Sequence, residues 1–156
     1  MRTRPDKQIK ISECSIDDLR AEIGSLAEEH WLELEDSKKL FKLSIDWASY
    51  EEVEANGKLI TLVVRNEGEV IGYSVTMLYM PIHSDTVLIG INSALFLRKE
   101  HRSGGLGARL ILATESAARQ HGARAMNWHA KPATAMSQVM ERMGYEVRHT
   151  TYSRSI

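Results

Sequence analysis

The first third of the chain carries hydrophobic residues at helical spacing. Two helices are predicted there, one from Ser15 to Trp31 or Leu34 and one from Asp36 to about Tyr50. Their apolar stripes consist of Leu19, Ile23, Leu26 and Ala27 in the first helix and of Leu40, Leu43 and Trp47 in the second. Ser15 is the predicted N-cap of the first helix. A short strand over residues 8–11 is predicted to precede it.

From residue 59 the pattern changes to runs that are typical of β-strands. Residues 59–64 and 70–79 flank the polar sequence Asn66-Glu67-Gly68-Glu69, which predicts an antiparallel hairpin. A third strand is predicted over 87–97. Period-two alternation along the second strand predicts one shared face for Ile71, Tyr73, Val75, Met77 and Tyr79.

The last third returns to alternating helices and strands. A helix is predicted over 106–121, a strand over 123–129, a helix over 132–143 and one or two strands over 145–154. This order of elements predicts an α/β fold of the mixed α+β kind. Neither a repeat nor a linker interrupts it, so we expect a single domain over 1–156, with residues 1–7 as a flexible tail.

Composition narrows the class of protein. The chain is 43% apolar and 26% charged with a net charge of −1, which is ordinary for a soluble globular domain and argues against a general polyanion-binding role. No run reaches the roughly 20 apolar residues of a membrane span. Cys14 is the only cysteine, which excludes an intramolecular disulfide and fits a cytoplasmic protein. Scattered histidines predict no metal site.

A glycine-rich turn lies between the third strand and the next helix, with the sequence Arg102-Ser103-Gly104-Gly105-Leu106-Gly107. Unpaired N–H groups and the helix dipole make a helix N-terminus an anion site, and glycines let a ligand approach the backbone. The turn lacks the Gly-Lys-Ser/Thr of a Walker A loop and the third glycine of a dinucleotide fingerprint. A loop that only turns the chain is the structural alternative. Nearby basic residues favour a small phosphorylated ligand; they are Arg98, Lys99, His101, Arg102 and Arg109.

The stretch 95–110 resembles the acetyl-CoA-binding motif of the GNAT N-acetyltransferases, with Arg102, Gly105 and Gly107 at the Arg-x-x-Gly-x-Gly positions. Gly144-Tyr145 matches the family's Gly-aromatic pair. The resemblance covers 59–154 and implies a central mixed, mostly antiparallel sheet flanked by helices, with acetyl-CoA as co-substrate. It implies cofactor contacts from Leu95, Phe96, Leu97, Arg102, Ser103, Gly104, Gly105, Leu106, Gly107 and Ala108.

A narrower resemblance is to GNAT-like proteins of phages and prophages. It rests on His30-Trp31, Asp46-Trp47, His83 and His129-x-Lys131. By family placement Trp31 and Trp47 lie beside the acceptor cleft, and we expect at least one of them to line it. His83 is a further candidate contact to the acceptor.

Acetyl transfer to an amine needs a proton acceptor, donors for the developing oxyanion and an acid for the departing thiolate. The candidate bases are His30, Glu33, Glu29 and His83, each of which has a structural alternative as a solvated charge or a hydrogen-bonded histidine. Family resemblance places a tyrosine acid where this chain has Met140. The candidate substitutes are Ser137, His129 and Tyr152.

We therefore expect an N-acetyltransferase that moves an acetyl group from acetyl-CoA to a primary amine by direct attack in a ternary complex. The acceptor could be a small polyamine-like or amino-sugar molecule, a modified nucleobase or a protein amine. An acidic cleft from Glu28, Glu29, Glu33, Glu35 and Asp36 would favour a cationic acceptor. Met140 supports an alternative, a catalytically degenerate acyl-CoA-binding module, and a phosphate-binding regulatory domain is a third. No membrane partner is expected, and a homodimer is compatible with the resemblance.

Overall fold

The computed structural model describes residues 9–34 and 42–156. The predicted tail over 1–7 and the beginning of the second predicted helix lie outside these residues. In chain order the described elements are β1 (Ile9–Cys14), α1 (Ile16–Glu22), α2 (Leu26–Glu33), α3 (Trp47–Ala55), β2 (Leu59–Asn66), β3 (Glu69–Tyr79), β4 (Leu88–Leu97), the 3-10 helix η3 (Lys99–His101), α4 (Leu106–Gln120), β5 (Ala123–Asn127) and α5 (Ala135–Arg142).

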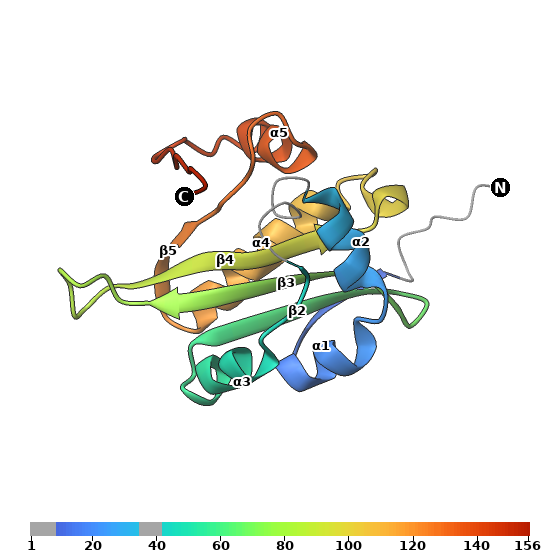
Figure 1. The fold of residues 1–156 in the computed structure, drawn as a ribbon, viewed down its shortest axis with the longest axis horizontal. Coiled ribbons are helices and arrows are strands. Elements are labelled where there is room, and N and C mark those ends of the chain that lie inside the picture. The colour runs from blue at the N-terminus through green and yellow to red at the C-terminus, as the bar shows by residue number, and fades with distance from the viewer. Residues whose placement is uncertain (1–8, 35–41) are drawn as a thin grey trace.

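One five-stranded sheet, in the order β1-β2-β3-β4-β5, runs through the middle of the fold (Figure 1). Strands β1 to β4 are antiparallel to their neighbours, whereas β5 runs parallel to β4. Glu67 and Gly68 join β2 to β3 with φ angles of 51° and 89°, as a tight hairpin turn requires. The predicted hairpin and the mostly antiparallel mixed sheet are confirmed.

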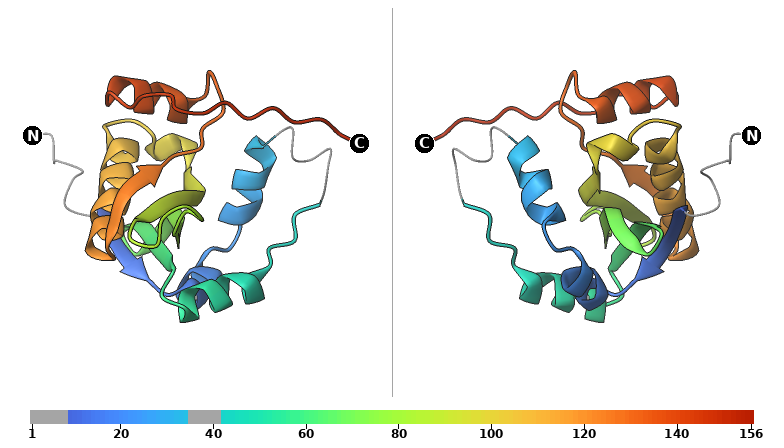
Figure 2. Two further views of the ribbon diagram at one scale, coloured as in Figure 1. Left: turned by 90° about the vertical axis from the view of Figure 1, so that its left-hand side faces the viewer. Right: turned by 90° about the vertical axis from the view of Figure 1, so that its right-hand side faces the viewer.

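Helices cover both faces of this sheet. α2 and α4 lie on opposite sides of it (Figure 2). Tyr73 and Phe96 pack with α1 and α2, while Ile71 and Leu97 pack with α4. The carboxyl end of β4 therefore sends side chains into both apolar layers, and it leads directly into the glycine-rich turn.

The first predicted helix is broken into two. The Ser15 side chain accepts a hydrogen bond from the Asp18 N–H at 3.0 Å, which confirms it as the N-cap of α1. α1 ends at Glu22 and α2 begins at Leu26, with Gly24 between them at a φ of 49°. That left-handed conformation suits glycine and ends a right-handed helix, so the prediction of one continuous helix was wrong.

The second predicted helix begins later than expected. Residues 42–46 are not helical, and α3 begins at Trp47 because the Asp46 side chain accepts a hydrogen bond from the Ser49 N–H at 3.0 Å. Leu43 therefore does not share a helix face with Trp47. The rest of the prediction, over 36–41, lies outside the described residues.

Ile71 is an extra residue in the ladder between β2 and β3. Val64 pairs with Gly72 and Arg65 pairs with Val70, which leaves Ile71 without a partner across the ladder. Such a bulge shifts the alternation of faces by one residue. Ile71 accordingly packs toward α4 while Tyr73 packs toward α1 and α2, and the prediction that they share a face was wrong.

The last third of the chain agrees with the sequence pattern up to α5. α4 is followed by Gly122, at a φ of 93°, and β5 ends two residues earlier than predicted. Residues 145–156 form neither strand nor helix, contrary to prediction. They lie mostly exposed and pair with no described strand, although the Tyr145 N–H still donates to the Met140 carbonyl at 3.1 Å. No described helix has the length and apolar character to cross a bilayer.

Candidate functional site

The glycine-rich turn presents an open helix N-terminus. Gly104 and Gly105 have φ angles of 74° and 81°, and α4 begins directly afterwards. The Arg109 N–H donates to the Gly105 carbonyl at 3.0 Å, so the N–H groups of residues 106–108 precede the first bond of the helix. A Cβ at Gly104, Gly105 or Gly107 would meet no atom within 4 Å. The turn is therefore an uncovered cradle of backbone donors.

At the carboxyl end of β4, one edge pairs with no strand in the part of the chain that the structure describes. β4 pairs with β5 only from Leu88 to Ile91, whereas its pairing with β3 continues to Leu97. The Arg98 N–H donates to the Ile71 carbonyl at 2.9 Å. Alternation along an antiparallel ladder then directs the N–H groups of Leu95 and Leu97 away from β3. They point to the side on which β5 has already diverged.

Gly72 brings β3 unusually close to this end of β4. A Cβ at Gly72 would lie 2.7 Å from the carbonyl oxygen of Phe96 and 2.9 Å from a methyl carbon of Leu97. Both distances are shorter than nonbonded atoms tolerate. The absence of a side chain at Gly72 therefore sets where the strand with the free edge lies.

The side chain of Arg102 is already engaged. Its Nε donates to the Leu97 carbonyl at 2.7 Å, and a terminal nitrogen donates to both carboxylate oxygens of Glu33 at 2.8 Å. The guanidinium carbon also lies 5.5 Å from the ring centroid of Phe96. Arg102 thus ties α2 to the end of β4, and the ion pair occupies the carboxylate of Glu33, one of the predicted bases.

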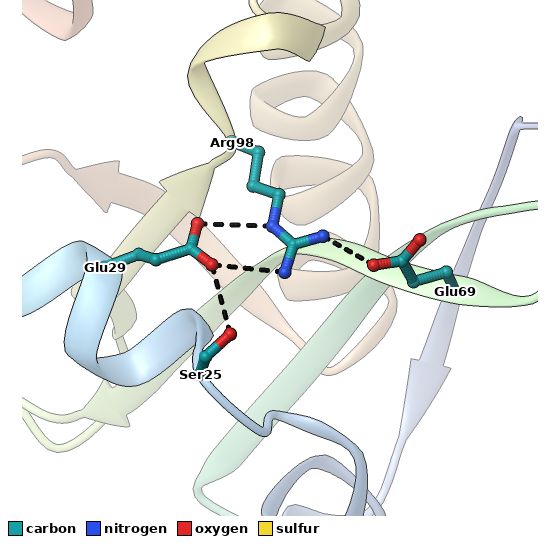
Figure 3. Close-up of polar contacts among 4 residues, drawn as sticks. All are labelled: Ser25, Glu29, Glu69 and Arg98. Carbon is teal, nitrogen blue, oxygen red and sulfur yellow. Dashed lines mark hydrogen bonds and ion pairs between the residues drawn. The ribbon is translucent and has the colours of Figure 1, made fainter.

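Arg98 makes a second connection between α2 and the sheet. Its guanidinium lies between the carboxylates of Glu29 and Glu69, and Ser25 donates to Glu29 (Figure 3). The hydrogen bond from Arg98 lowers the pKa of Glu29. Two members of the basic cluster predicted from sequence, Arg98 and Arg102, are therefore paired with carboxylates.

His30 lies in an aromatic cluster on the α2 face of the sheet. Its Nδ1 shares a hydrogen bond of 2.8 Å with the Tyr73 hydroxyl, and its ring stacks on Phe96 at a centroid distance of 4.9 Å. Burial lowers the pKa of His30; the charge of Glu33 raises it and that of Arg102 lowers it. Burial also raises the pKa of Tyr73. The pair is therefore a neutral imidazole beside a neutral phenol near pH 7.

A cavity of about 130 Å³ adjoins His30. Apolar and aromatic side chains from α1, α2, α3, β3 and β4 form most of its wall, among them Leu19, Ile23, Trp31, Trp47, Tyr50 and Val75. Ala94 of β4 also lines it, and the neighbouring Ser93 shares a hydrogen bond of 2.6 Å with the Tyr50 hydroxyl. Both predicted tryptophans thus line one cavity on the α2 face.

Three other predicted site residues are not brought to this place. His83 is exposed in the loop between β3 and β4 and does not line the cavity. Tyr152 is 91% exposed and lies outside any strand, so the expectation that a last strand carries it back to the site was wrong. The side chain of His129 is exposed just after β5.

Asn92, which the sequence did not single out, holds the chain where β4 and β5 part. Its side-chain oxygen accepts a hydrogen bond from the His129 N–H at 2.6 Å, and its side-chain nitrogen donates to the His129 carbonyl at 3.3 Å. An asparagine amide presents a donor and an acceptor together, as a backbone peptide does. Asn92 thus continues the contact beyond the last ladder pair, between Ile91 and Asn127.

The candidate residues in and around α5 make contacts that hold the fold together. Met140 is buried, and Ser137 belongs to a capping box with Thr134. The hydroxyl of Tyr145 donates to Glu115 of α4 at 2.5 Å, and the same carboxylate oxygen accepts from the Trp128 indole at 3.0 Å. The Gly-aromatic pair therefore anchors the end of α5 to α4.

Comparison with known proteins agrees with this arrangement. The model of the Acetyltransferase (GNAT) family matches residues 20–145. A comparison with curated proteins found no match.

Solved structures share the fold at low sequence identity. An aminoglycoside acetyltransferase from an uncultured soil metagenomic sample is 14% identical with a TM-score of 0.74, covering 95% of this chain and 98% of that chain. A ribosomal-protein-alanine N-acetyltransferase from Brucella melitensis is 14% identical with a TM-score of 0.68, covering 95% and 99%. AAC(6')-Iy in complex with a CoA bisubstrate analog is 21% identical with a TM-score of 0.65, covering 96% and 99%. With the family model spanning most of its length, this chain belongs to the GNAT acetyltransferase family.

Proposed function

We propose that the protein transfers the acetyl group of acetyl-CoA to a primary amine by direct attack in a ternary complex. One observation supports this most strongly: the open amides of the glycine-rich turn follow within a few residues of the β4 N–H groups that pair with no described strand. A pyrophosphate needs the first set of donors. A carbonyl that develops negative charge needs the second.

The donors present fit acetyl-CoA, which supplies an activated thioester when bound. Residues 103–108 would hold the pyrophosphate, and Leu95 and Leu97 would donate to the thioester carbonyl. Arg102 would act chiefly by fixing the end of β4, because Leu97 and Glu33 occupy its guanidinium. These roles use backbone groups, so they do not depend on a polar side chain in the turn.

His30 is our candidate for the group that takes the proton of the attacking amine. A base role needs the tautomer in which Nδ1–H donates to the Tyr73 oxygen and Nε2 carries the lone pair. The lowered pKa of His30 keeps the ring in the neutral form that such a role requires. Glu33 then acts as a positioning residue through its ion pair with Arg102.

The departing thiolate has no acid that the described structure brings to the end of β4. Ser137 is used in the cap of α5, Tyr152 is exposed, and Met140 replaces the family tyrosine. We propose that positioning and amide donors supply the rate enhancement instead. The buried Met140 equally favours the alternative, an acyl-CoA-binding module without catalysis.

Direct attack is supported by the position of the only cysteine. Cys14 lies on β1, the sheet edge opposite β5. Burial raises the pKa of its thiol to about 11, so the reactive thiolate is scarce near pH 7. A covalent acetyl-cysteine route is therefore disfavoured. A single cysteine cannot form a disulfide within the chain, which fits the cytoplasmic location that we propose.

The substitution Gly107→Glu tests the cradle. Gly107 has open space around its Cα and no left-handed φ, and an acidic residue in the first turn favours a helix. We expect the free protein to melt at an unchanged or slightly higher temperature. The stabilisation by CoA, about 2.7 kcal/mol at a hundredfold excess over its dissociation constant, should disappear.

Gly107→Gln is the matched control, since it adds bulk without charge and should retain part of the CoA effect. The release of free thiol from acetyl-CoA, measured over a panel of amines, then distinguishes an acetyltransferase from an acyl-CoA-binding module without catalysis. CoA stabilisation without thiol release on any amine would establish the module. Undiminished CoA affinity in Gly107→Glu would remove the basis for the site.

A further inference from the structure

The cavity beside His30 has the size and chemistry of a site for one apolar ring. Its volume is about 130 Å³, and an apolar cavity of about 150 Å³ in another protein binds benzene. No charged residue belongs to its wall among the described residues. The wall combines aliphatic side chains with the flat surfaces of Trp31 and Trp47. A single six-membered ring or a short branched alkyl group would fill it.

Among residues 9–34 and 42–156, no carboxylate that could serve as a counter-charge for a polycation lines this cavity. Of the acidic cleft predicted from sequence, Glu29 is bound by Arg98 and Glu33 by Arg102. Glu35 and Asp36 lie outside the described residues. Glu28 is exposed and does not line the cavity. Against the described wall, a polyamine or aminoglycoside would exchange its hydration for apolar contacts without gaining an ion pair, which is unfavourable.

The cavity adjoins the strand that carries the candidate carbonyl donors. Ala94 lines it and precedes Leu95, whose N–H points to the free edge of β4. His30 lies in the wall as well, stacked on Phe96. A ring that fills this cavity would thus contact β4 at Ala94, the residue before the candidate carbonyl donor Leu95.

We infer that the acceptor is a small aralkyl or branched alkyl primary amine, whose single apolar group fills this cavity. This inference rests on the proposed function. The amine nitrogen attacks the thioester carbonyl carbon, an N–C bond forms and the C–S bond breaks. The sulfur leaves with the bonding electrons, and the proton lost by the amine ends on the thiolate directly or through His30 and solvent. The products are the N-acetylamine and free CoA.

An amine panel tests the substrate class by thiol release at fixed acetyl-CoA. The probes are 2-phenylethylamine, isopentylamine, spermidine, neamine and an alanyl peptide. Burial of the ring predicts a kcat/KM for 2-phenylethylamine that is about tenfold or more above that for spermidine. Preference for spermidine, neamine or the peptide would overturn the inference while leaving the acetyltransferase in place. No turnover of any amine would overturn the proposed function instead.

Tryptophan fluorescence gives a readout that needs no turnover. Trp31 and Trp47 line the cavity, whereas Trp128 is bonded to Glu115 elsewhere. 2-Phenylethylamine should change the emission of a Trp128→Phe variant in a saturable way, and spermidine should not. The absence of any saturable change with the ring amine would contradict ring binding even if some amine is acetylated.

Ala27→Leu adds three carbon atoms to the cavity wall and should raise the KM for 2-phenylethylamine about tenfold, with a smaller effect on methylamine. Ala21→Leu, on the exposed side of α1, is the matched control and should leave both amines unchanged. Thermal melting of each variant verifies folding. If Ala27→Leu fails to fold, Ala27→Val replaces it. Equal KM values for 2-phenylethylamine in the folded variant and in the control would show that the acceptor does not bind in this cavity.

Discussion

At the scale of single residues, the role of a charged side chain in the candidate site depends on the side chain with which it pairs. Glu33 and Arg102 looked like a base and an anion ligand in the sequence, and each now has the other as its partner. Their separation of 69 positions along the chain gave no sign of this pairing. The backbone-based part of the candidate site was easier to predict, because glycines before a helix carry their geometry in the sequence.

His30 should make stability depend on pH below neutrality. Burial lowers its pKa in the folded chain, so the unfolded chain binds a proton first as the pH falls. The free energy of unfolding is therefore full above pH about 6.5 and decreases as the pH falls toward the lowered folded pKa, by at most about 1.4 kcal/mol per pH unit. Urea unfolding at several pH values between 7 and 5.5 measures this slope.

His30→Gln keeps a hydrogen-bonding group for Tyr73 and should flatten that slope. His129→Gln changes an exposed side chain and should leave it as in the parent protein. A slope that is equally steep in all three proteins would show that another group is responsible.

At the scale of elements, a strand can be recognised from its sequence while its partners cannot. The runs of β2, β3 and β4 and the stripe of α4 were predictable from periodicity. The bulge at Ile71 was not, because Val70 and Ile71 are both apolar and the sequence therefore does not show that the alternation of faces shifts there. The break at Gly24 has a signal in the sequence, because glycine favours the end of a helix, but the apolar residues keep their helical spacing across it. Residues 145–154 have a strand-like pattern, yet the described fold offers them no partner.

We expect the Asn92 side chain to hold the chain after β5 against β4 at the point where the two strands separate. Asn92→Ala removes both hydrogen bonds to the His129 backbone and should lower the free energy of unfolding by about 1–2 kcal/mol. Asn92→Asp keeps the acceptor for the His129 N–H and loses the donor, so we expect a smaller loss. Urea denaturation gives the energies, and amide exchange at His129 reports the local opening. If the His129 amide is as protected from hydrogen exchange in Asn92→Ala as in the parent protein, this role of Asn92 is refuted.

At the scale of the whole molecule, two arginine–carboxylate connections hold α2 against the end of β4. Arg98 and Arg102 lie at the start and the end of η3 and bind Glu29 and Glu33, one turn apart on α2. The cavity on one side of α2 and the donor edge of β4 are therefore positioned by the same contacts. Such coupling could not be predicted from sequence, since it depends on how the helix lies on the sheet.

The two ion pairs should raise the stability of the fold and lower its affinity for CoA. Glu29→Gln with Glu33→Gln removes two negative charges near the turn. We expect a loss of about 0.5–2 kcal/mol in the free energy of unfolding, and CoA binding that is a few-fold tighter at low salt. The gain should vanish near 0.5 M salt, where screening is short-ranged. Calorimetry at two salt concentrations measures both affinities.

Glu51→Gln is the control for this effect, because its partner Arg20 lies on α1. The control should alter stability slightly and CoA affinity not at all. Weaker CoA binding in the double variant would contradict this prediction, because the placement of α2 by the ion pairs would then matter more for CoA than the negative charge near the turn.

Gly72 has a consequence for how sequences of this type can diverge. No substrate group is assigned to it, yet any larger residue there would displace the strand that carries the donor edge. Homologues that retain the same chemistry should therefore keep this position free of a side chain, although it lies outside the cradle. A search for proteins with the same function should therefore require glycine at the position of Gly72. A mutant library built to change the acceptor should leave Gly72 unchanged.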